Sequence, residues 1–134
     1  DFTLALMFDK DRQPIWKDDA VSGLLGGNAQ EKTAEAKAAS PVTYVSSDDP
    51  PFITFHGTKD QRVAYRHAET IHAALQKAGV TSLLVPITDG GHGSVSHPEV
   101  KVRGQQFTDK VLRGIASTID TSPLQALPEA PRNK

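Results

Sequence analysis

Short apolar runs and amphipathic segments alternate in the second half of the chain. Residues 52–55 (FITF) and 82–87 (SLLVPI) are compact runs rich in β-branched, aromatic and aliphatic residues, which predicts two buried strands. Between them, apolar residues recur at spacings of 4, 3, 4 and 3, which predicts one face of a helix that stops at Gly79. These apolar positions are Ala64, Ala68, Ile71, Leu75 and Ala78. Pro86 lacks a donor for the sheet ladder, so the second strand is expected to be an edge strand or to finish there.

A second helix is expected after the second strand. Ser96 and Glu99 have capping-box spacing, with Pro98 in the first turn. The apolar residues that follow are spaced 7, 4 and 4 apart, which predicts one apolar face. They are Val100, Phe107, Val111 and Ile115. The order strand, helix, strand, helix predicts an α/β fold, a βαβα unit with two parallel strands joined by a right-handed crossover.

The remaining segments carry weaker patterns. Residues 1–45 are expected to form short helices and loops, including a helix over 28–39 with Asn28 as its N-cap and Glu31 three residues later. Residues 46–120 hold the βαβα unit, and the Pro-rich residues 121–134 show no periodicity, which predicts an extended or disordered tail. A dense apolar group between Phe2 and Trp16 is expected to pack against the rest of a larger domain.

Composition excludes several classes of function. The 134 residues carry 15 Lys and Arg against 16 Asp and Glu, and only 6% are aromatic, so the chain has neither the basic surface nor the stacking residues of a nucleic-acid binder. No run approaches the ~20 apolar residues that a membrane span needs. The absence of Cys excludes disulfides, thiolate metal sites and Cys nucleophiles. With 37% hydrophobic residues and a mean hydropathy of −0.39, the core is expected to be thin.

Titratable residues follow both predicted strands. Asp60 lies in the HGTKD loop after the first strand, and His92 lies in the DGGHG loop after the second. Because parallel strands deliver their carboxyl ends to one edge of the sheet, we expect these side chains to meet in a direct hydrogen bond. An Asp that accepts the Nδ1 proton of a His leaves Nε2 available as a general base.

Other candidates have simpler interpretations. Asp89 is three residues from His92 in the same turn, so it is expected to form the turn rather than to partner the imidazole. His56 ends a strand and is expected to make a structural hydrogen bond. His67 and His72 are spaced five apart and do not share a helix face as metal ligands would, and His97 is expected at a helix start. No metal or other cofactor is expected.

The motifs DDPPF, HGTKDQRV and GGHG, in this order and spacing, resemble the C-terminal part of α/β-hydrolase esterases and lipases of the hormone-sensitive-lipase and feruloyl-esterase-like type. The resemblance covers roughly residues 1–116. It implies an α/β-hydrolase fold, with 1–45 as a cap-like segment, and hydrolysis of a small carboxylic ester without a cofactor. In that family the Asp of HG-x-x-D-x-x-V and the His of GHG complete a Ser-Asp/Glu-His triad, which carries over to Asp60 and His92.

One departure from the family is serious: no G-x-S-x-G occurs in the 134 residues. The family's nucleophile elbow and oxyanion hole lie upstream of the matched region. We therefore expect the chain alone to be inactive, and the N-terminal part of the same hydrolase to carry the serine. The start at Asp1 also suggests a cleaved, nicked or truncated chain, and any signal peptide would lie upstream.

Two alternatives stay open at this point. The chain could be a non-catalytic α/β module that pairs its open strand edge with a partner chain, because two strands with an exposed edge are marginal alone. It could also belong to a peptidase on the same scaffold, because an Asp-His pair does not distinguish an ester from an amide.

Overall fold

The computed structural model describes residues 20–128. The N-terminal part holds two short helices and a 3₁₀ turn: α1 (Ala20–Leu25), α2 (Thr33–Ala38) and η2 (Pro41–Tyr44). The remainder holds the sheet and its two longer helices: β1 (Phe52–Gly57), α3 (Arg66–Lys77), β2 (Ser82–Thr88), η3 (Ser94–Ser96), α4 (Pro98–Arg113) and β3 (Leu124–Gln125). The chain is therefore of the α/β class, as its sequence predicts.

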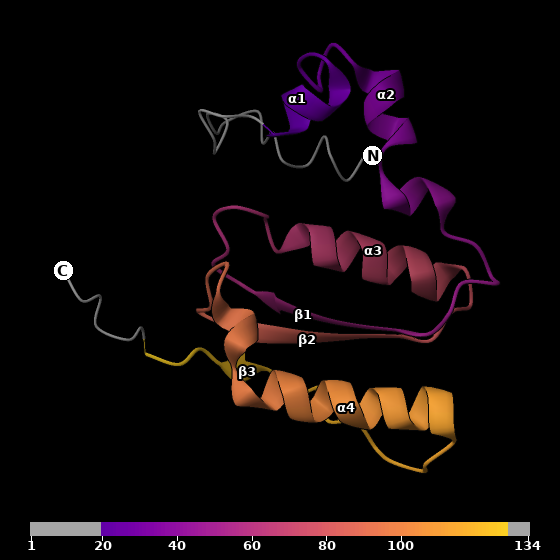
Figure 1. The fold of residues 1–134 in the computed structure, drawn as a ribbon, viewed down its shortest axis with the longest axis vertical. Helices are drawn as coiled ribbons and strands as arrows, with labels where there is room; N and C mark the ends of the chain where they lie inside the picture. The colour runs from indigo at the N-terminus through magenta and orange to yellow at the C-terminus, as the bar shows by residue number, and fades with distance from the viewer. Residues whose placement is uncertain (1–19, 129–134) are drawn as a thin grey trace.

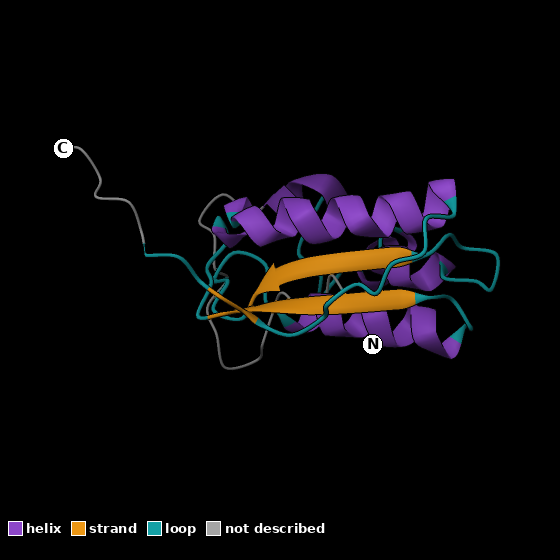
Figure 2. Ribbon diagram, turned by 90° about the horizontal axis from the view of Figure 1, so that it is seen from below, coloured by secondary structure: helices purple, strands orange, loops and turns teal. Residues whose placement is uncertain are grey.

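The sheet has three parallel strands in the order β1-β2-β3. Phe52 pairs with Ser82 at one end of the β1–β2 ladder and Gly57 with Ile87 at the other. Figure 1 shows the sheet between α3 on one side and α4 on the other, and Figure 2 shows the strands from below. Because the strands run in one direction, the loops after β1 and β2 emerge at the same edge.

The two faces of β1 contact different helices, since alternate residues of a strand point to opposite sides. Ile53 and Phe55 pack with Val100 of α4 against the buried pair Val85 and Ile87. His56 has the opposite parity and faces the side of α3. The largest buried side chains are few, and β1's apolar residues are only partly covered, so the core is small.

The crossover helix α3 confirms its sequence prediction. Ala68 and Leu75 are buried on its inner face. Its end is stabilised by Gly79, which has a φ of +83° and donates its N–H to the carbonyl of Gln76. Val80 donates to the carbonyl of Leu75 in the same terminal motif. A glycine is required here because its φ is in the left-handed region.

Helix α4 forms where a helix is expected, but it begins differently. The N-cap is His97, whose Nδ1 accepts the N–H of Glu99 at 3.1 Å, rather than Ser96. Its predicted apolar face is only half buried: Phe107 is buried, whereas Val111 and Ile115 are exposed. Ile115 lies beyond the helix, which ends at Arg113 with Gly114 in the left-handed conformation.

The sequence does not predict β3. Residues 121–134 were expected to be extended or disordered, and in the described part of that stretch Leu124 is extended, buried and paired with Ile87. Arg103, itself buried, donates from Nη1 to the carbonyls of Asp120 and Ser122, and its Nη2 lies 3.0 Å from Asp120 Oδ2. A side chain from α4 therefore holds the segment that leads into β3, a contact that no local periodicity signals.

Strand β2 is consequently the middle strand and not an edge. It continues to Thr88, two residues beyond Pro86. Thr88 O accepts the N–H of Ala126 on the β3 side, and Pro86 has the same parity as Thr88. The backbone nitrogen of Pro86 therefore points toward the β3 side, at a position before the first residue of β3. No strand is there to receive an N–H, so the missing donor of Pro86 costs the sheet no hydrogen bond.

The predicted helix over 28–39 is shortened at its start. Asn28 does not cap it, because Asn28 Oδ1 accepts the N–H of Gln30 at 2.9 Å and its carbonyl accepts those of Glu31 and Lys32. These bonds make a separate turn, and α2 starts only at Thr33. The end before Ser40 and Pro41 is as predicted. The apolar group between residues 2 and 16 lies outside the described residues.

Candidate functional site

The loops after β1 and β2 interlock at the carboxyl edge of the sheet. Thr58 N–H donates to Ile87 O at 3.0 Å, and Lys59 N–H donates to Gly90 O at 2.9 Å. A Cβ at Gly57 would lie 2.3 Å from Gly90 O and 2.6 Å from Gly91 O. Only glycine allows this approach of one backbone to the other, so Gly57 sets the distance between the two loops.

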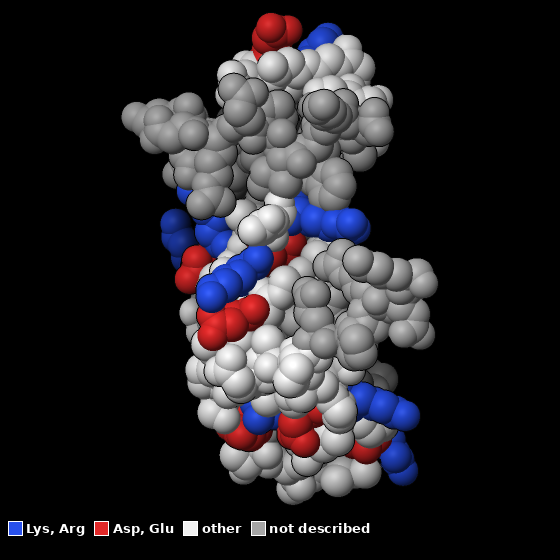
Figure 3. Space-filling model, turned by 90° about the vertical axis from the view of Figure 1, so that its left-hand side faces the viewer, with Lys and Arg blue, Asp and Glu red and all other residues white. Residues whose placement is uncertain are grey.

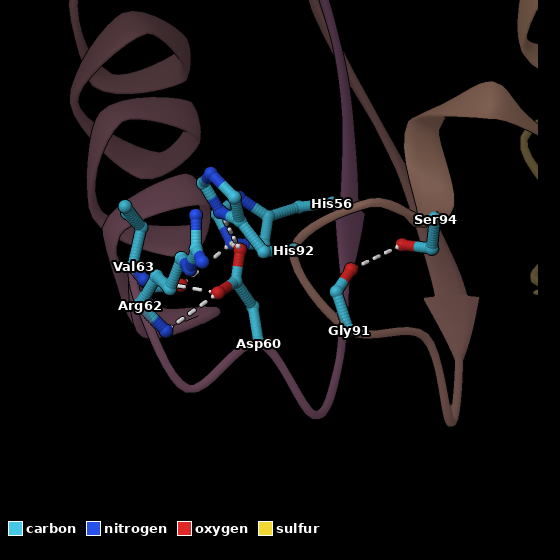
Figure 4. Close-up of polar contacts among 7 residues, drawn as sticks. All are labelled: His56, Asp60, Arg62, Val63, Gly91, His92 and Ser94. Carbon is cyan, nitrogen blue, oxygen red and sulfur yellow. Dashed lines mark hydrogen bonds and ion pairs between the residues drawn. The ribbon is translucent and has the colours of Figure 1, made fainter. Parts of the chain in front are cut away.

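This approach brings Asp60 and His92 together (Figure 4). His92 Nδ1 lies 3.0 Å from Asp60 Oδ2, the direct hydrogen bond that the sequence predicts. The carboxylate has no acidic proton to share at neutral pH, so the imidazole Nδ1–H is the donor. The Asp60 side chain is 5% exposed, whereas that of His92 is 51% exposed. The pair thus has a buried acceptor and an accessible ring.

A tight turn immobilises the other carboxylate oxygen. Asp60 Oδ1 accepts the N–H of Arg62 at 2.8 Å and the N–H of Val63 at 3.0 Å. Burial raises the pKa of Asp60, but the hydrogen bonds from Val63, His92 and Arg62 and the charge of His92 together outweigh it and hold the pKa below its usual value. The carboxylate is therefore ionised at neutral pH, the state in which it can accept from His92.

The sequence predicts only one of the two contacts that His56 makes. Its Nε2 makes the expected structural hydrogen bond, 2.8 Å from Val63 O. The same nitrogen also lies 3.4 Å from Asp60 Oδ2. The adjacent residues His56 and Gly57 at the end of β1 are the sequence feature that could have indicated this contact, because both lie against the loops of the site.

Asp89 forms the turn, as expected. It has a φ of +60° and pairs with Lys59 Nζ at 2.6 Å, and Gln125 Nε2 donates to its Oδ2 at 3.4 Å. The hydrogen bonds to Lys59 and then Gln125, with the charge of Lys59, lower the pKa of Asp89. Asp89 is thus engaged by the Lys59 ammonium and the Gln125 amide.

The remaining histidines have separate surroundings. His72 Nδ1 contacts Ser82 Oγ at 2.8 Å, and His97 caps α4. Burial, then the charges of Arg66 and His56, lower the pKa of His67. Within residues 20–128, no group of three or more potential ligands is arranged to hold a metal ion.

A hollow lies beside His92, on the side of β3. Its volume is about 560 Å³. One wall is the loop from Asp89 to Ser94, and the other is Ala126, Leu127 and Pro128, which β3 delivers to this edge. Figure 3 views the molecule from the side of this edge and shows acidic and basic side chains interspersed on that face. None of the described helices has the length and apolar character needed to cross a bilayer.

The fold defines a portion of an α/β-hydrolase, a parallel sheet covered by helices on both faces, and the solved structures that it resembles are esterases. The structure of a thermophilic esterase from the Planctomycetes species Thermogutta terrifontis, Est2, with butyrate bound, is 26% identical, with a TM-score of 0.59 over 81% of this chain and 40% of that one. Native Est2 is 25% identical, with a TM-score of 0.57 over 72% of this chain and 36% of that one.

The chain belongs to the BD-FAE family, whose sequence model matches residues 3–75. That match includes Asp60 and ends before the loop of His92. Among curated proteins, Esterase LipQ of Mycobacterium tuberculosis (strain ATCC 25618 / H37Rv) is 45% identical over 47 residues, which are 35% of this chain and 11% of LipQ. The chain therefore corresponds to well under two thirds of the proteins that it matches.

Proposed function

We propose that this chain contributes the Asp and His of the catalytic triad of a carboxylic-ester hydrolase. The observation that carries the proposal is the 3.0 Å contact between His92 Nδ1 and Asp60 Oδ2, at the carboxyl ends of two adjacent parallel strands. The esterases to which the chain is similar support the choice of an ester as substrate. The accessible ring of His92 next to a hollow of about 560 Å³ leaves room for a small substrate.

In this mechanism Asp60 stays ionised and orients His92. The Nδ1–H bond to Asp60 fixes the tautomer in which Nε2 of His92 is a base. Nε2 takes the proton of a serine hydroxyl as the serine oxygen attacks the ester carbonyl. It then gives that proton to the oxygen of the departing alcohol, and the acyl-serine remains. In the second half of the reaction, Nε2 takes a proton from water as the water oxygen bonds to the acyl carbon. Nε2 then gives this proton to the serine oxygen as the bond between that oxygen and the acyl carbon breaks, so the acid is released and the serine is restored.

We propose that the serine and the oxyanion hole come from polypeptide outside the 134 residues, because G-x-S-x-G does not occur among them. Strand β1 is paired only with β2 in the described sheet, so its other edge can accept a further parallel strand. In this proposal residues 1–45 form a cap-like segment and 46–120 form the end of the hydrolase sheet. The chain's 40% share of Est2 leaves ample length for the missing elements.

The first experiment asks which polypeptide accompanies the chain. The native protein is isolated through an antibody against residues 20–128, its intact mass is measured, and its hydrolysis of p-nitrophenyl acetate is assayed. We expect a mass larger than 14.4 kDa, or a second chain that contains G-x-S-x-G, and turnover that a serine-directed phosphonate blocks. The 134-residue chain alone should neither turn over the ester nor react with the phosphonate.

The second experiment assigns the roles. In the active material, His92→Gln and Asp60→Asn should each lower kcat by about 10³-fold or more, while His72→Gln, at a histidine remote from the pair, should leave it unchanged. Full activity of the His92 variant would refute the proposal. Turnover of a peptide amide in preference to the ester would instead favour the peptidase alternative.

A further inference from the structure

His56 makes a second contact with Asp60 in the site, at the same carboxylate oxygen that His92 contacts. His56 Nε2 lies 2.8 Å from Val63 O and 3.4 Å from Asp60 Oδ2, and the His56 side chain is 15% exposed. Val63 O can only accept a hydrogen bond, so Nε2 of His56 carries a hydrogen. A ring nitrogen of each imidazole therefore lies close to the same carboxylate oxygen (Figure 4): His92 Nδ1 by a hydrogen bond, and His56 Nε2, whose hydrogen goes to Val63 O, at 3.4 Å.

The hydrogen bond from His56 to Val63 O links His56 to the turn that binds the Asp60 carboxylate. Val63 N–H holds Asp60 Oδ1, while Val63 O is held by His56. His56 thus fixes the turn that supplies the hydrogen bonds to Oδ1 of Asp60. The ring of His56 is itself placed by Tyr65, whose ring meets it edge to face at 5.8 Å.

We propose that His56 is a positioning residue: it holds the turn around Asp60 so that Oδ2 faces His92. This inference rests on the proposed function, and it adds to the pair a residue that acts through Asp60 without touching substrate. Its chemistry requires a donor at the position of Nε2, not a charge or an aromatic ring. A glutamine can supply such a donor from its amide, whereas a phenylalanine keeps the ring shape and supplies none.

The test compares His56→Phe and His56→Gln in the full 134-residue chain by NMR. The readouts are the titration of the Asp60 carboxyl carbon and the low-field resonance of the His92 Nδ1 proton. We expect His56→Phe to raise the pKa of Asp60 by roughly half a unit or more and to broaden or remove the His92 proton. His56→Gln should restore both readouts toward those of the unchanged chain.

The groups that face Asp60 are kept constant in this comparison. They are His92 from the loop after β2, and the turn from Arg62 to Val63 that leads into α3. His72→Phe is the matched control, since His72 is also partly buried with one hydrogen bond, at 2.8 Å to Ser82 Oγ. It should leave the Asp60 titration and the His92 proton unchanged, so a general loosening of the fold is distinguished from a local effect.

Three results would overturn the proposal. One is an Asp60 titration that does not move in a folded His56→Phe chain, and another is a His56→Gln chain that behaves like His56→Phe. If His56→Phe fails to fold, nitrogen chemical shifts of the unchanged chain decide, because a proton on Nδ1 in place of Nε2 of His56 would refute the geometry. None of these readouts needs catalysis, so loss of the proposed function would appear separately, as an inactive native protein with an intact His56 effect.

Discussion

Replacing Gly57 by alanine tests whether the approach of the two loops holds the site together. The new Cβ would lie 2.3 Å from Gly90 O, and ordinary van der Waals contact begins at 3.4 Å. The Gly90 backbone must therefore move away by about 1 Å, because the new Cβ and the Gly90 carbonyl oxygen are both fixed by the backbone and cannot rotate apart. A retreat of that size lengthens the bond from Lys59 N–H, now 2.9 Å, to about 4 Å, beyond hydrogen-bonding distance.

The thermodynamic cost follows from these two effects. Overpacking costs about 1–3 kcal/mol, and the lost backbone hydrogen bond about 1 kcal/mol. We expect Gly57→Ala to lower the free energy of unfolding by about 2–4 kcal/mol, measured by urea denaturation of the 134-residue chain. In an active assembly, displacing His92 from Asp60 by about 1 Å should also lower kcat by about 10²-fold.

Gly91→Ala is the matched control for this change. It makes the same substitution in the facing loop, and a Cβ there meets no described atom within 4 Å. Its unfolding free energy should stay within about 0.5 kcal/mol of the unchanged chain. The reasoning fails if the two variants are equally stable, or if the His92 Nδ1 proton resonance is unaltered in Gly57→Ala.

Three further changes probe the surrounding structure. Gly104→Ala, inside α4 and with open space at its Cβ, should raise the unfolding free energy by about 0.5–1 kcal/mol in the same urea assay, and a loss of stability would contradict this. Arg103→Met should free the segment before β3 and speed hydrogen exchange of the Ala126 amide at least about tenfold, whereas Arg113→Met, at an exposed ion pair on the same helix, should not. Since its hydrogen bonds depress the folded-state pKa of Asp60, this carboxylate stabilises the fold above its ordinary pKa, and the stabilisation is lost as pH falls through the depressed value; Asp60→Asn should flatten that part of the stability curve in acid titrations followed by circular dichroism.

The sequence predicts the two main strands, the crossover helix and the pairing of Asp60 with His92. These features depend on local patterns: compact apolar runs, a 4-3-4-3 spacing, and loops at fixed positions after each strand. The direction of parallel strands then brings distant loops together without any knowledge of side-chain packing. The proximity of Asp60 and His92 could therefore be predicted from the sequence.

The features that escaped prediction depend on contacts between distant residues. Strand β3 has two residues and no periodicity, and it forms because Leu124 is buried against Ile87 and because Arg103 holds the preceding turn. The second contact of His56, with Asp60 Oδ2, depends on where the loop after β1 places that carboxylate. Such tertiary contacts override local propensity and cannot be obtained from spacing along the chain.

The interlocked loops also have a consequence for motion. Four interactions bridge the described parts of these loops besides the Asp60–His92 contact. Three are hydrogen bonds: Thr58 N–H to Ile87 O, Asp89 N–H to Thr58 Oγ1, and Lys59 N–H to Gly90 O. The fourth is the ion pair of Lys59 with Asp89. A displacement of either loop must therefore move the other loop as well. Motions of the surrounding helices change the position of Asp60 and His92 together more than they change the distance between the two side chains. NMR relaxation measurements on the two loops should accordingly report one shared rate of conformational exchange. On heating, both loops should lose their structure at the same temperature.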